Sequence, residues 1–413
     1  MAFIDSDRLR SLLDGINRFG FNPETGGYNR PGYSDADMAV REWFAGTMQA
    51  EGLTVRQDGV ANLFGRFGPV DSPCIMAGSH LDTVPEGGAF DGALGVAVAL
   101  ECVLAIRDAG LEPRVAIEVV ATAEEEGRFG GMLGSQSITG SVTRKWLSQA
   151  TDAEGIRLID AMARVGLDAW DALAAKRNDV LAFIELHVEQ GPVLQHRSVP
   201  LGIAHSVSGV CNLRVVLKGE ANHSGTTPME LRADAFAGLA TFGSVIPKII
   251  AAHGDKDTRV TVGKADLRPN FIHTIAGEAE FIVNIRDTSA DRLDTLEAAI
   301  RSEIAAAARA NKLEAGITRH SRIAPVKLDA ELANLLREEA HALGLATLSM
   351  PSGAGHDAQT MQAICPSALI FVPSRDGISH SPQEWTDWSY IKKGAELMLA
   401  ALVRFSMDRF VST

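Results

Sequence analysis

The stretch Cys74-Ile75-Met76-Ala77-Gly78-Ser79-His80-Leu81-Asp82 begins with an apolar run, which is typical of a strand buried inside a sheet. His80 and Asp82 follow at the end of this strand, and Asp91 comes shortly afterwards on a glycine-bounded loop before an apolar helix. In α/β proteins the chemistry lies at the carboxyl ends of strands. A neutral imidazole and a loop carboxylate can begin a metal site. We therefore expect His80 and Asp91 to bind metal, with Asp82 orienting the imidazole.

The size and charge of the chain exclude several classes of protein. Its 413 residues are more than one hydrophobic core normally serves, so two domains are expected. The net charge is −13 and no block of Lys or Arg occurs, which argues against a nucleic-acid or membrane partner. The first ten residues lack an apolar signal core, and no stretch of about 18 apolar residues is evident. Four scattered cysteines suit a reducing compartment, so we predict a soluble cytoplasmic protein.

Hydrophobic periodicity predicts an α/β fold interrupted by a second domain. The first part has helices over residues 5–19, 35–51, 93–109 and 153–175, and strands over 53–67, 74–77, 114–121 and 180–187. From Leu213 the expected order is β-α-β-β-α-β, which suggests a ferredoxin-like sandwich. A helix over 330–343, a strand over 368–372 and a helix over 388–405 then complete the first domain. The predicted boundaries are 1–208 and 326–413 for the catalytic domain and 209–325 for the inserted one.

Further metal-ligand candidates follow other predicted strands, namely Glu125-Glu126, His187 and His380. Nitrogen and carboxylate donors without thiolate favour zinc, with manganese or cobalt as alternatives. Five ligands exceed the needs of one tetrahedral zinc, but they fit two ions that share a hydroxide if Asp91 bridges them. A neighbouring carboxylate that does not bind metal is then needed as general base, and Glu125 supplies one. No nucleotide-binding glycine motif and no serine-hydrolase motif occurs.

Seven short motifs resemble those of one enzyme family. They are Gly-Ser-His80-Leu-Asp82-Thr, Gly-Gly-Ala-Phe-Asp91-Gly, Glu125-Glu126-Gly, Leu-His187-Val-Glu-Gln190-Gly, Asn-His223-Ser-Gly-Thr-Thr-Pro-Met, Ser-Gly-Ala-Gly-His356-Asp-Ala and Ser-His380-Ser-Pro. This pattern resembles the hydantoinase/carbamoylase family of amidohydrolases, which includes N-carbamoyl-L-amino-acid hydrolases, β-ureidopropionases and allantoate amidohydrolases. The resemblance implies a mixed-sheet dinuclear-zinc exopeptidase-like catalytic domain with an inserted ferredoxin-like α+β dimerisation domain. It also implies a homodimer formed through that domain.

The resemblance implies a role for each matching ligand. His80 and His187 would hold one divalent ion, Glu126 and His380 the other, and Asp91 would bridge the two. Glu125 would take a proton from the bridging water and pass it to the leaving nitrogen, while Asp82 orients His80.

The substrate-binding residues are also implied by the resemblance. His223 would reach the partner subunit's active site and help polarise the scissile carbonyl. Gln190 and Arg286 would hold the substrate, with Arg286 pairing with its α-carboxylate. The Gly353–Gly355 loop would offer backbone amides. For His356, a substrate contact, a supporting role and a cap of the next helix remain open.

Two departures from the family pattern stand out. The usual Glu-Glu-Gly-Ser-Arg-Phe is one residue shorter here, and Glu124 precedes the pair. An ungapped match would make Glu124 the base and Glu125 the ligand; we prefer Glu125 and Glu126 because this keeps Glu-Glu-Gly intact. In the substrate-binding motif that begins at Pro269-Asn270, His273 replaces the usual Asn, which affects the expected substrate more than the reaction.

The predicted reaction is metal-dependent cleavage of the ureido C–N bond of an N-carbamoyl amino acid, releasing the amino acid, ammonia and carbon dioxide. Allantoate, N-carbamoyl-β-alanine, N-acyl amino acids and dipeptides are alternative substrates. The alternative from another class is an inactive protein that binds an amino-acid derivative. Loss of a ligand or of the base would indicate it, and neither is lost in this sequence.

Overall fold

The computed structural model describes residues 2–407, and the chain divides into two compact units. One, called here the split unit, comprises Met1–His205 and Leu328–Thr413. The other, the inserted unit, comprises Ser206–Lys327 and lies between the two halves in sequence.

Most of a nine-stranded mixed sheet lies in the split unit; the sheet has the order β1-β2-β4-β3-β5-β13-β6-β11, with β12 paired to β6. Its strands are β1 Thr54–Gln57, β2 Leu63–Phe67, β3 Cys74–His80, β4 Ala116–Thr122, β5 Val180–Val188, β6 Leu201–Val207, β11 Val326–Lys327, β12 Thr347–Ser352 and β13 Ser367–Val372. The middle strands β4, β3, β5 and β13 run parallel, and β2 and β6 pair antiparallel to them. The predicted α/β class with a mixed sheet is therefore confirmed.

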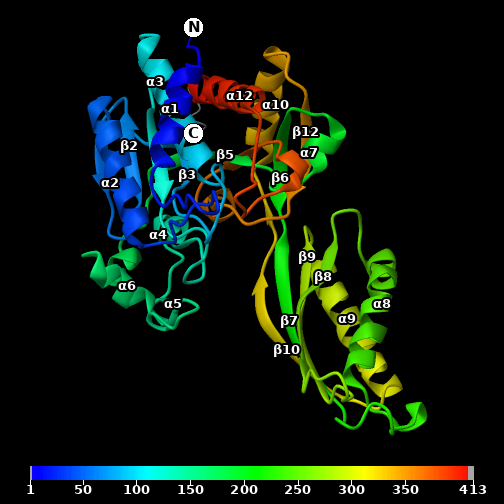
Figure 1. Ribbon diagram of the computed structural model, residues 1–413. Coiled ribbons are helices and arrows are strands. Elements are labelled where there is room, and N and C mark those ends of the chain that lie inside the picture. Colours follow the sequence, from blue (N-terminus) through cyan, green and yellow to red (C-terminus); the bar gives the residue numbers. More distant parts are fainter. Residues whose placement is uncertain (1, 408–413) are drawn as a thin grey trace. The chain divides into compact units, whose positions relative to one another are not determined.

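Helices lie before, between and after the strands of this sheet in the order of the chain (Figure 1). They are α1 Ser6–Ile16, α2 Asp35–Ala50, α3 Ala93–Asp108, α4 Leu133–Thr139, α5 Arg144–Gln149, α6 Leu158–Arg164, α7 Val193–Arg197, α10 Ala330–Ala342, α11 Asp357–Met361 and α12 Trp388–Met407, with 3-10 turns η1 Ala169–Leu173 and η3 Arg375–Gly377. Every residue of α3 from Ala93 to Ile106 is buried, as its all-round apolar sequence predicts. This burial fixes the loop before α3, which carries Asp91.

The single helix expected over residues 153–175 is wrong. The structure has two shorter pieces there, α6 and η1. Gly166 between them has φ +80°, a left-handed conformation that ends a helix, and the side chain of Asp168 then accepts from the N–H of Trp170.

The inserted unit has the ferredoxin-like order expected from the sequence. Its elements are β7 Gly209–Lys218, η2 Met229–Leu231, α8 Ala235–His253, β8 Arg259–Arg268, β9 Glu278–Asp287, α9 Ala290–Ala310 and β10 Glu314–Ile323. The four strands form an antiparallel sheet in the order β10-β7-β9-β8. Figure 1 shows α8 and α9 together on one side of this sheet, where Phe242 of α8 stacks on Phe281 of β9 with ring centroids 5.9 Å apart.

Helix α8 corrects the expectation that no apolar stretch is long enough to span a bilayer. An 18-residue window within Ala235–His253 has a mean hydropathy of 1.6, and 22% of that window is buried. By length and composition alone α8 meets the criterion for a membrane span, and it is the one helix among residues 2–407 that does so. Its buried residues, including Phe242 and Ile249, belong to the hydrophobic core of the inserted unit.

Candidate metal centre

Two histidines and one aspartate meet at the carboxyl edge of the parallel strands. His80 ends β3 and His187 lies near the end of the neighbouring strand β5, while Asp91 is on the loop between β3 and α3. All three side chains are buried. Asp91 Oδ1 lies 3.4 Å from His80 Nε2 and 3.0 Å from His187 Nε2, so one carboxylate oxygen faces both imidazoles.

The second oxygen of Asp91 faces another pair of ligand candidates. His380 Nε2 lies 3.4 Å from Asp91 Oδ2 and 3.4 Å from Glu126 Oε2. The candidate ligand atoms thus form two overlapping groups, His80-Asp91-His187 and Asp91-Glu126-His380, with Asp91 common to both. This is the arrangement in which a carboxylate can bridge two cations.

Backbone carbonyls hold the two buried imidazoles. Nδ1 of His80 is 2.9 Å from the carbonyl oxygen of Asp82, and Nδ1 of His187 is 2.9 Å from that of Val188. A carbonyl can only accept, so Nδ1 of each ring carries a proton and Nε2 is the nitrogen that faces Asp91.

The site carries an excess of negative charge, which a bound cation would offset. Burial and the nearby Asp91 raise the pKa of Glu126 to about 7. Burial opposes charging of His187, but Asp91 outweighs it and raises the pKa of this imidazole to about 9. Glu126 Oε1 is buried and has no hydrogen-bond partner among residues 2–407. Divalent metals such as zinc are bound by carboxylate oxygens and imidazole nitrogens. An unpaired carboxylate oxygen beside these imidazoles therefore fits a divalent metal ion.

The three consecutive glutamates point in different directions. Glu124 has φ 54°, and its Oε1 accepts from the N–H of Phe129 at 2.5 Å, outside both ligand groups. Glu125 Oε2 lies 3.6 Å from His80 Nε2, and Glu126 faces His380. This geometry favours Glu125 and Glu126 over the alternative pair Glu124 and Glu125.

Asp82 has a different contact from the one expected. Its carboxylate oxygen Oδ1 lies 3.9 Å from His80 Nδ1, which is too far for a hydrogen bond. His80 Nδ1 instead contacts the main-chain carbonyl of Asp82. The two carboxylate oxygens accept from the backbone N–H groups of Glu125 at 3.2 Å and Glu126 at 3.0 Å. The Asp82 side chain therefore positions the glutamate pair, because the turn after β4 directs both amides at it.

Three further predicted residues lie in the split unit near these ligands. Gln190 Nε2 donates to Asp91 Oδ2 at 2.7 Å. His356 is buried with its ring centroid 4.6 Å from that of His187, and burial lowers its pKa well below the usual value. Its Nε2 is 2.9 Å from Ser352 Oγ, and its side chain makes no cap bond to α11, which removes the capping alternative. Gly355 lies against the Met132 side chain.

The remaining predicted residues belong to the inserted unit and are described within it. His223 forms a β-bridge with Thr274, and the N–H of Ser224 donates to the carbonyl of His273 at 3.0 Å, so the two histidine segments are paired. Arg286 lies on β9, where its Nε donates to Asn284 Oδ1 at 3.1 Å.

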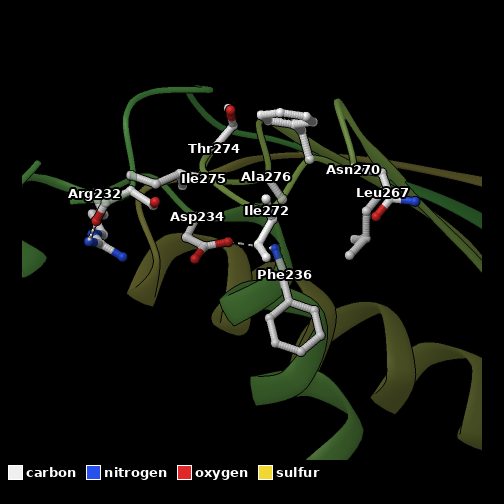
Figure 2. A pocket seen from close by; sticks show the side chains of 11 residues that line it. Arg232, Asp234, Phe236, Leu267, Asn270, Ile272, Thr274, Ile275 and Ala276 are labelled. Carbon is white, nitrogen blue, oxygen red and sulfur yellow. Dashed lines mark hydrogen bonds between the residues drawn. The ribbon is translucent and has the colours of Figure 1, made fainter. Parts of the chain in front are cut away.

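A pocket of about 450 Å³ in the inserted unit is lined by residues of the two paired segments, including Ser224 and Thr274 (Figure 2). Asn270 lines it, together with the exposed apolar side chains Phe236, Phe271 and Ile272. Figure 2 shows Phe236 and Asp234, from the start of α8, on the same pocket as the loop residues.

Two buried carboxylates close to the site, Glu185 and Glu384, are not predicted by any motif of the sequence. Glu185 accepts from Ser79 Oγ at 2.7 Å and from the N–H of Ala358 at 2.9 Å, and it forms a third candidate ligand group with His187 and His356. Glu384 contacts the loop of Asp91. Their contacts are with residues distant in sequence, so no local pattern indicates them, although Glu185 lies two residues before His187 and Glu384 four residues after His380.

Comparison with known proteins gives consistent matches over nearly the whole chain. The sequence pattern described as peptidase family M20/M25/M40 matches residues 76–404. The chain is 35% identical over 403 residues to the N-carbamoyl-L-amino-acid amidohydrolase of Paenarthrobacter aurescens, covering 96% of this chain and 97% of the relative. It is 34% identical over 408 residues to the allantoate amidohydrolase of Bacillus subtilis (strain 168), covering 96% and 97%.

A solved structure matches the fold as closely. This is an amidase of the hydantoinase/carbamoylase family from Burkholderia multivorans, with a TM-score of 0.92 and 30% sequence identity. The match covers 98% of this chain and 99% of that one.

Proposed function

Because the chain belongs to peptidase family M20/M25/M40 and, within it, to the hydantoinase/carbamoylase amidases, we propose that it hydrolyses the ureido C–N bond of an N-carbamoyl amino acid. The products are the free amino acid, ammonia and carbon dioxide. The observation that carries the proposal is Asp91, whose two oxygens face two separate groups of ligand candidates.

The proposed cofactors are two divalent ions, zinc or alternatively manganese or cobalt. His80 and His187 would hold one, Glu126 and His380 would hold the other, and Asp91 is the ligand candidate common to both groups. Bound there, the ions supply a water of lowered pKa and polarise the scissile carbonyl.

Glu125 is the proposed general base. Its carboxylate faces His80 Nε2 at 3.6 Å without occupying either ligand group of Asp91, which leaves it free to exchange a proton. Burial raises its pKa well above the ordinary value, which suits a group that takes a proton from water and returns it to the leaving nitrogen. The Asp82 carboxylate accepts from the backbone N–H of Glu125 and so fixes the main chain that carries this base.

Substrate binding is assigned to residues of both units. Gln190, Gly355 and His356 in the split unit are proposed contacts, supported by their closeness to Asp91, Met132 and His187. In the inserted unit they are Asn270, His273 and Arg286, with Arg286 pairing with the α-carboxylate.

We assign catalysis to residues 1–208 and 326–413 and dimerisation to residues 209–325. In the homodimer His223 serves the partner subunit's active site. The apolar, incompletely buried α8 and the exposed Phe236 and Ile272 support contact by this unit with a second copy. A cytoplasmic location is part of the same proposal, supported by four free, buried cysteines.

Allantoate is the second candidate substrate, favoured by the similarity to the Bacillus subtilis allantoate amidohydrolase. N-carbamoyl-β-alanine, N-acyl amino acids and dipeptides complete the set to be compared. All have a carbonyl carbon bonded to a leaving nitrogen, so one site geometry can be tested against each.

The test is metal content by elemental analysis, combined with ammonia release from N-carbamoyl amino acids, N-carbamoyl-β-alanine and allantoate before and after chelation. About two metals per chain and ammonia release that chelation abolishes and zinc restores would support the proposal. Metal without ammonia release would move the assignment to N-acyl or dipeptide substrates. A chain that neither binds metal nor gains activity with zinc, manganese or cobalt would refute it and favour the inactive binding protein.

A further inference from the structure

Glu384 is a buried carboxylate that joins two loops distant in sequence. Its Oε1 accepts from the N–H groups of Phe90 at 2.9 Å and Asp91 at 3.0 Å. Its Oε2 accepts from Ser379 Oγ at 2.6 Å. The side chain is almost fully buried, so each of these charge-assisted bonds replaces a bond to water.

Gly88 packs directly against the side chain of Glu384. A Cβ on Gly88 would lie 2.2 Å from Glu384 Oε1, so a glycine is required where the Asp91 loop passes this carboxylate. The neighbouring side chains Phe90 and Trp385 meet edge to face with ring centroids 5.5 Å apart. The contact between the two loops is therefore close and specific.

Each loop joined by Glu384 carries a proposed ligand. One bears Asp91, and the other bears His380, which follows Ser379 directly. Ser379 Oγ also lies 3.0 Å from Asp91 Oδ2, on the oxygen that faces His380.

His380 depends on its loop more than the other histidines do. His80 and His187 are buried, lie on strands and are held by backbone carbonyls. The His380 side chain is 49% exposed, and its backbone has φ 53°, a conformation uncommon for a residue with a side chain. Its position is therefore set by how the loop is tied down.

From this geometry we infer that Glu384 is a positioning residue that holds the Asp91–Glu126–His380 ligand group selectively. The inference rests on the metal-dependent function proposed above. Glu384 contacts neither substrate nor metal; it fixes the loop of His380 against the loop of Asp91. Removing such a supporting contact typically weakens metal binding about 10- to 100-fold.

The test measures zinc bound per chain as free zinc is varied with a competing chelator, starting from chelated protein. For Glu384→Ala we expect one zinc to bind as in the wild type and the second to need at least about tenfold more free zinc. Glu384→Gln should bind zinc nearly as the wild type does, because its carbonyl can accept from the two backbone N–H groups while its amide donates to the Ser379 hydroxyl.

Asp58→Ala is the matched control. Asp58 Oδ1 also accepts two backbone N–H groups, from Val60 at 3.1 Å and Asn62 at 2.9 Å, but it lies outside the candidate ligand groups. It should lower the melting temperature and leave both zinc affinities unchanged. Ser379→Ala keeps Glu384 and removes the hydroxyl that links it to the His380 loop, which is the same hydroxyl that lies 3.0 Å from Asp91 Oδ2. It serves if Glu384→Ala does not fold, and it should weaken the same single zinc.

Three outcomes would overturn the inference. They are two zinc ions bound by Glu384→Ala at wild-type free zinc, equal weakening of both ions, and the same loss in Asp58→Ala. If the wild type itself binds no zinc, manganese or cobalt, the proposed function fails first and the inference fails with it. A wild type with two metals and an unaffected Glu384→Ala overturns this inference alone.

Discussion

Replacing Asp82 with Asn tests whether its side chain supports the glutamate pair or the histidine. The carboxylate accepts from the N–H groups of Glu125 and Glu126, one on each oxygen. An asparagine has one oxygen, so one N–H then faces an NH₂ group. His80 keeps its contact, because that contact uses the main-chain carbonyl of residue 82. The substitution should therefore disturb the base and its neighbour but leave the imidazole in place.

The magnitude follows from the bonds lost. A hydrogen bond to a charged group contributes about 1.5–3 kcal/mol, and a buried N–H left unpaired costs about 1–3 kcal/mol. If about 3 kcal/mol of this is lost from the transition state, kcat falls about 100-fold, since about 1.4 kcal/mol corresponds to a factor of ten. The assay is kcat and KM for ammonia release at saturating zinc, with zinc content and melting temperature measured on the same samples.

Asp37→Asn is the matched control. Asp37 is buried and accepts from Arg41 Nε at 2.9 Å and from the N–H of Tyr33, and Asp82 lies 3.8 Å from the same guanidinium, but the Asp37 carboxylate accepts no hydrogen bond from Glu125 or Glu126. Both variants should lose stability, and only Asp82→Asn should lose kcat. A kcat for Asp82→Asn equal to that of Asp37→Asn at equal zinc content would refute the assignment of the carboxylate to the glutamate pair.

Three further predictions concern the same site. Glu125→Gln should lower kcat about 10²- to 10⁴-fold with its zinc retained, as expected for a general base, whereas Glu124→Gln should keep most activity; the reverse result in rate and zinc assays would restore Glu124 as the base. In chelated protein, stability should fall as pH rises above about 5, because Glu126 has a folded pKa raised from 4.5 to about 7 and favours folding only while protonated. His187 acts in the same direction, because its pKa is raised from 6.5 to about 9 in the folded state and the resulting stability is lost as pH rises through that value. Thermal melts across pH, with and without zinc, should show that zinc raises the melting temperature by an amount that grows with pH. A melting temperature of the chelated protein that does not change with pH would contradict this. Gly88→Ala should weaken the second zinc as Glu384→Ala does, because its Cβ would clash with Glu384 Oε1, and unchanged zinc binding would show that the loop can yield there.

The residues at strand ends were predictable because they follow simple patterns. A buried strand has an apolar run, and parallel neighbours end at the same edge, so His80 and His187 could be expected to meet. Asp91 could be expected at the same site because it lies on the loop just before an all-apolar helix. These local signals were enough for the sheet class and for the candidate ligands, which the structure brings together.

What the sequence did not reveal depends on tertiary contacts. Glu384 is 293 positions from Asp91, and no local pattern predicts that its carboxylate accepts from the N–H of that residue. The contact of Asp82 with two backbone amides depends on the turn after β4. Strand β12, Thr347–Ser352, contains a proline and has no regular burial alternation, so periodicity could not detect it.

The chain leaves the split unit and returns to it at one place, which has a consequence for the evolution of the protein. Strands β6 and β11 pair there, with Ser206 opposite Lys327 and Val207 opposite Val326. The first and last strands of the inserted unit are also neighbours, since Val210 pairs with Ile323. Inserting a module whose two ends already lie side by side requires little loop closure, so an ancestral hairpin could accept it without rebuilding the host sheet. Excision should be equally simple: a two-residue turn from Val207 to Val326 would restore a continuous hairpin.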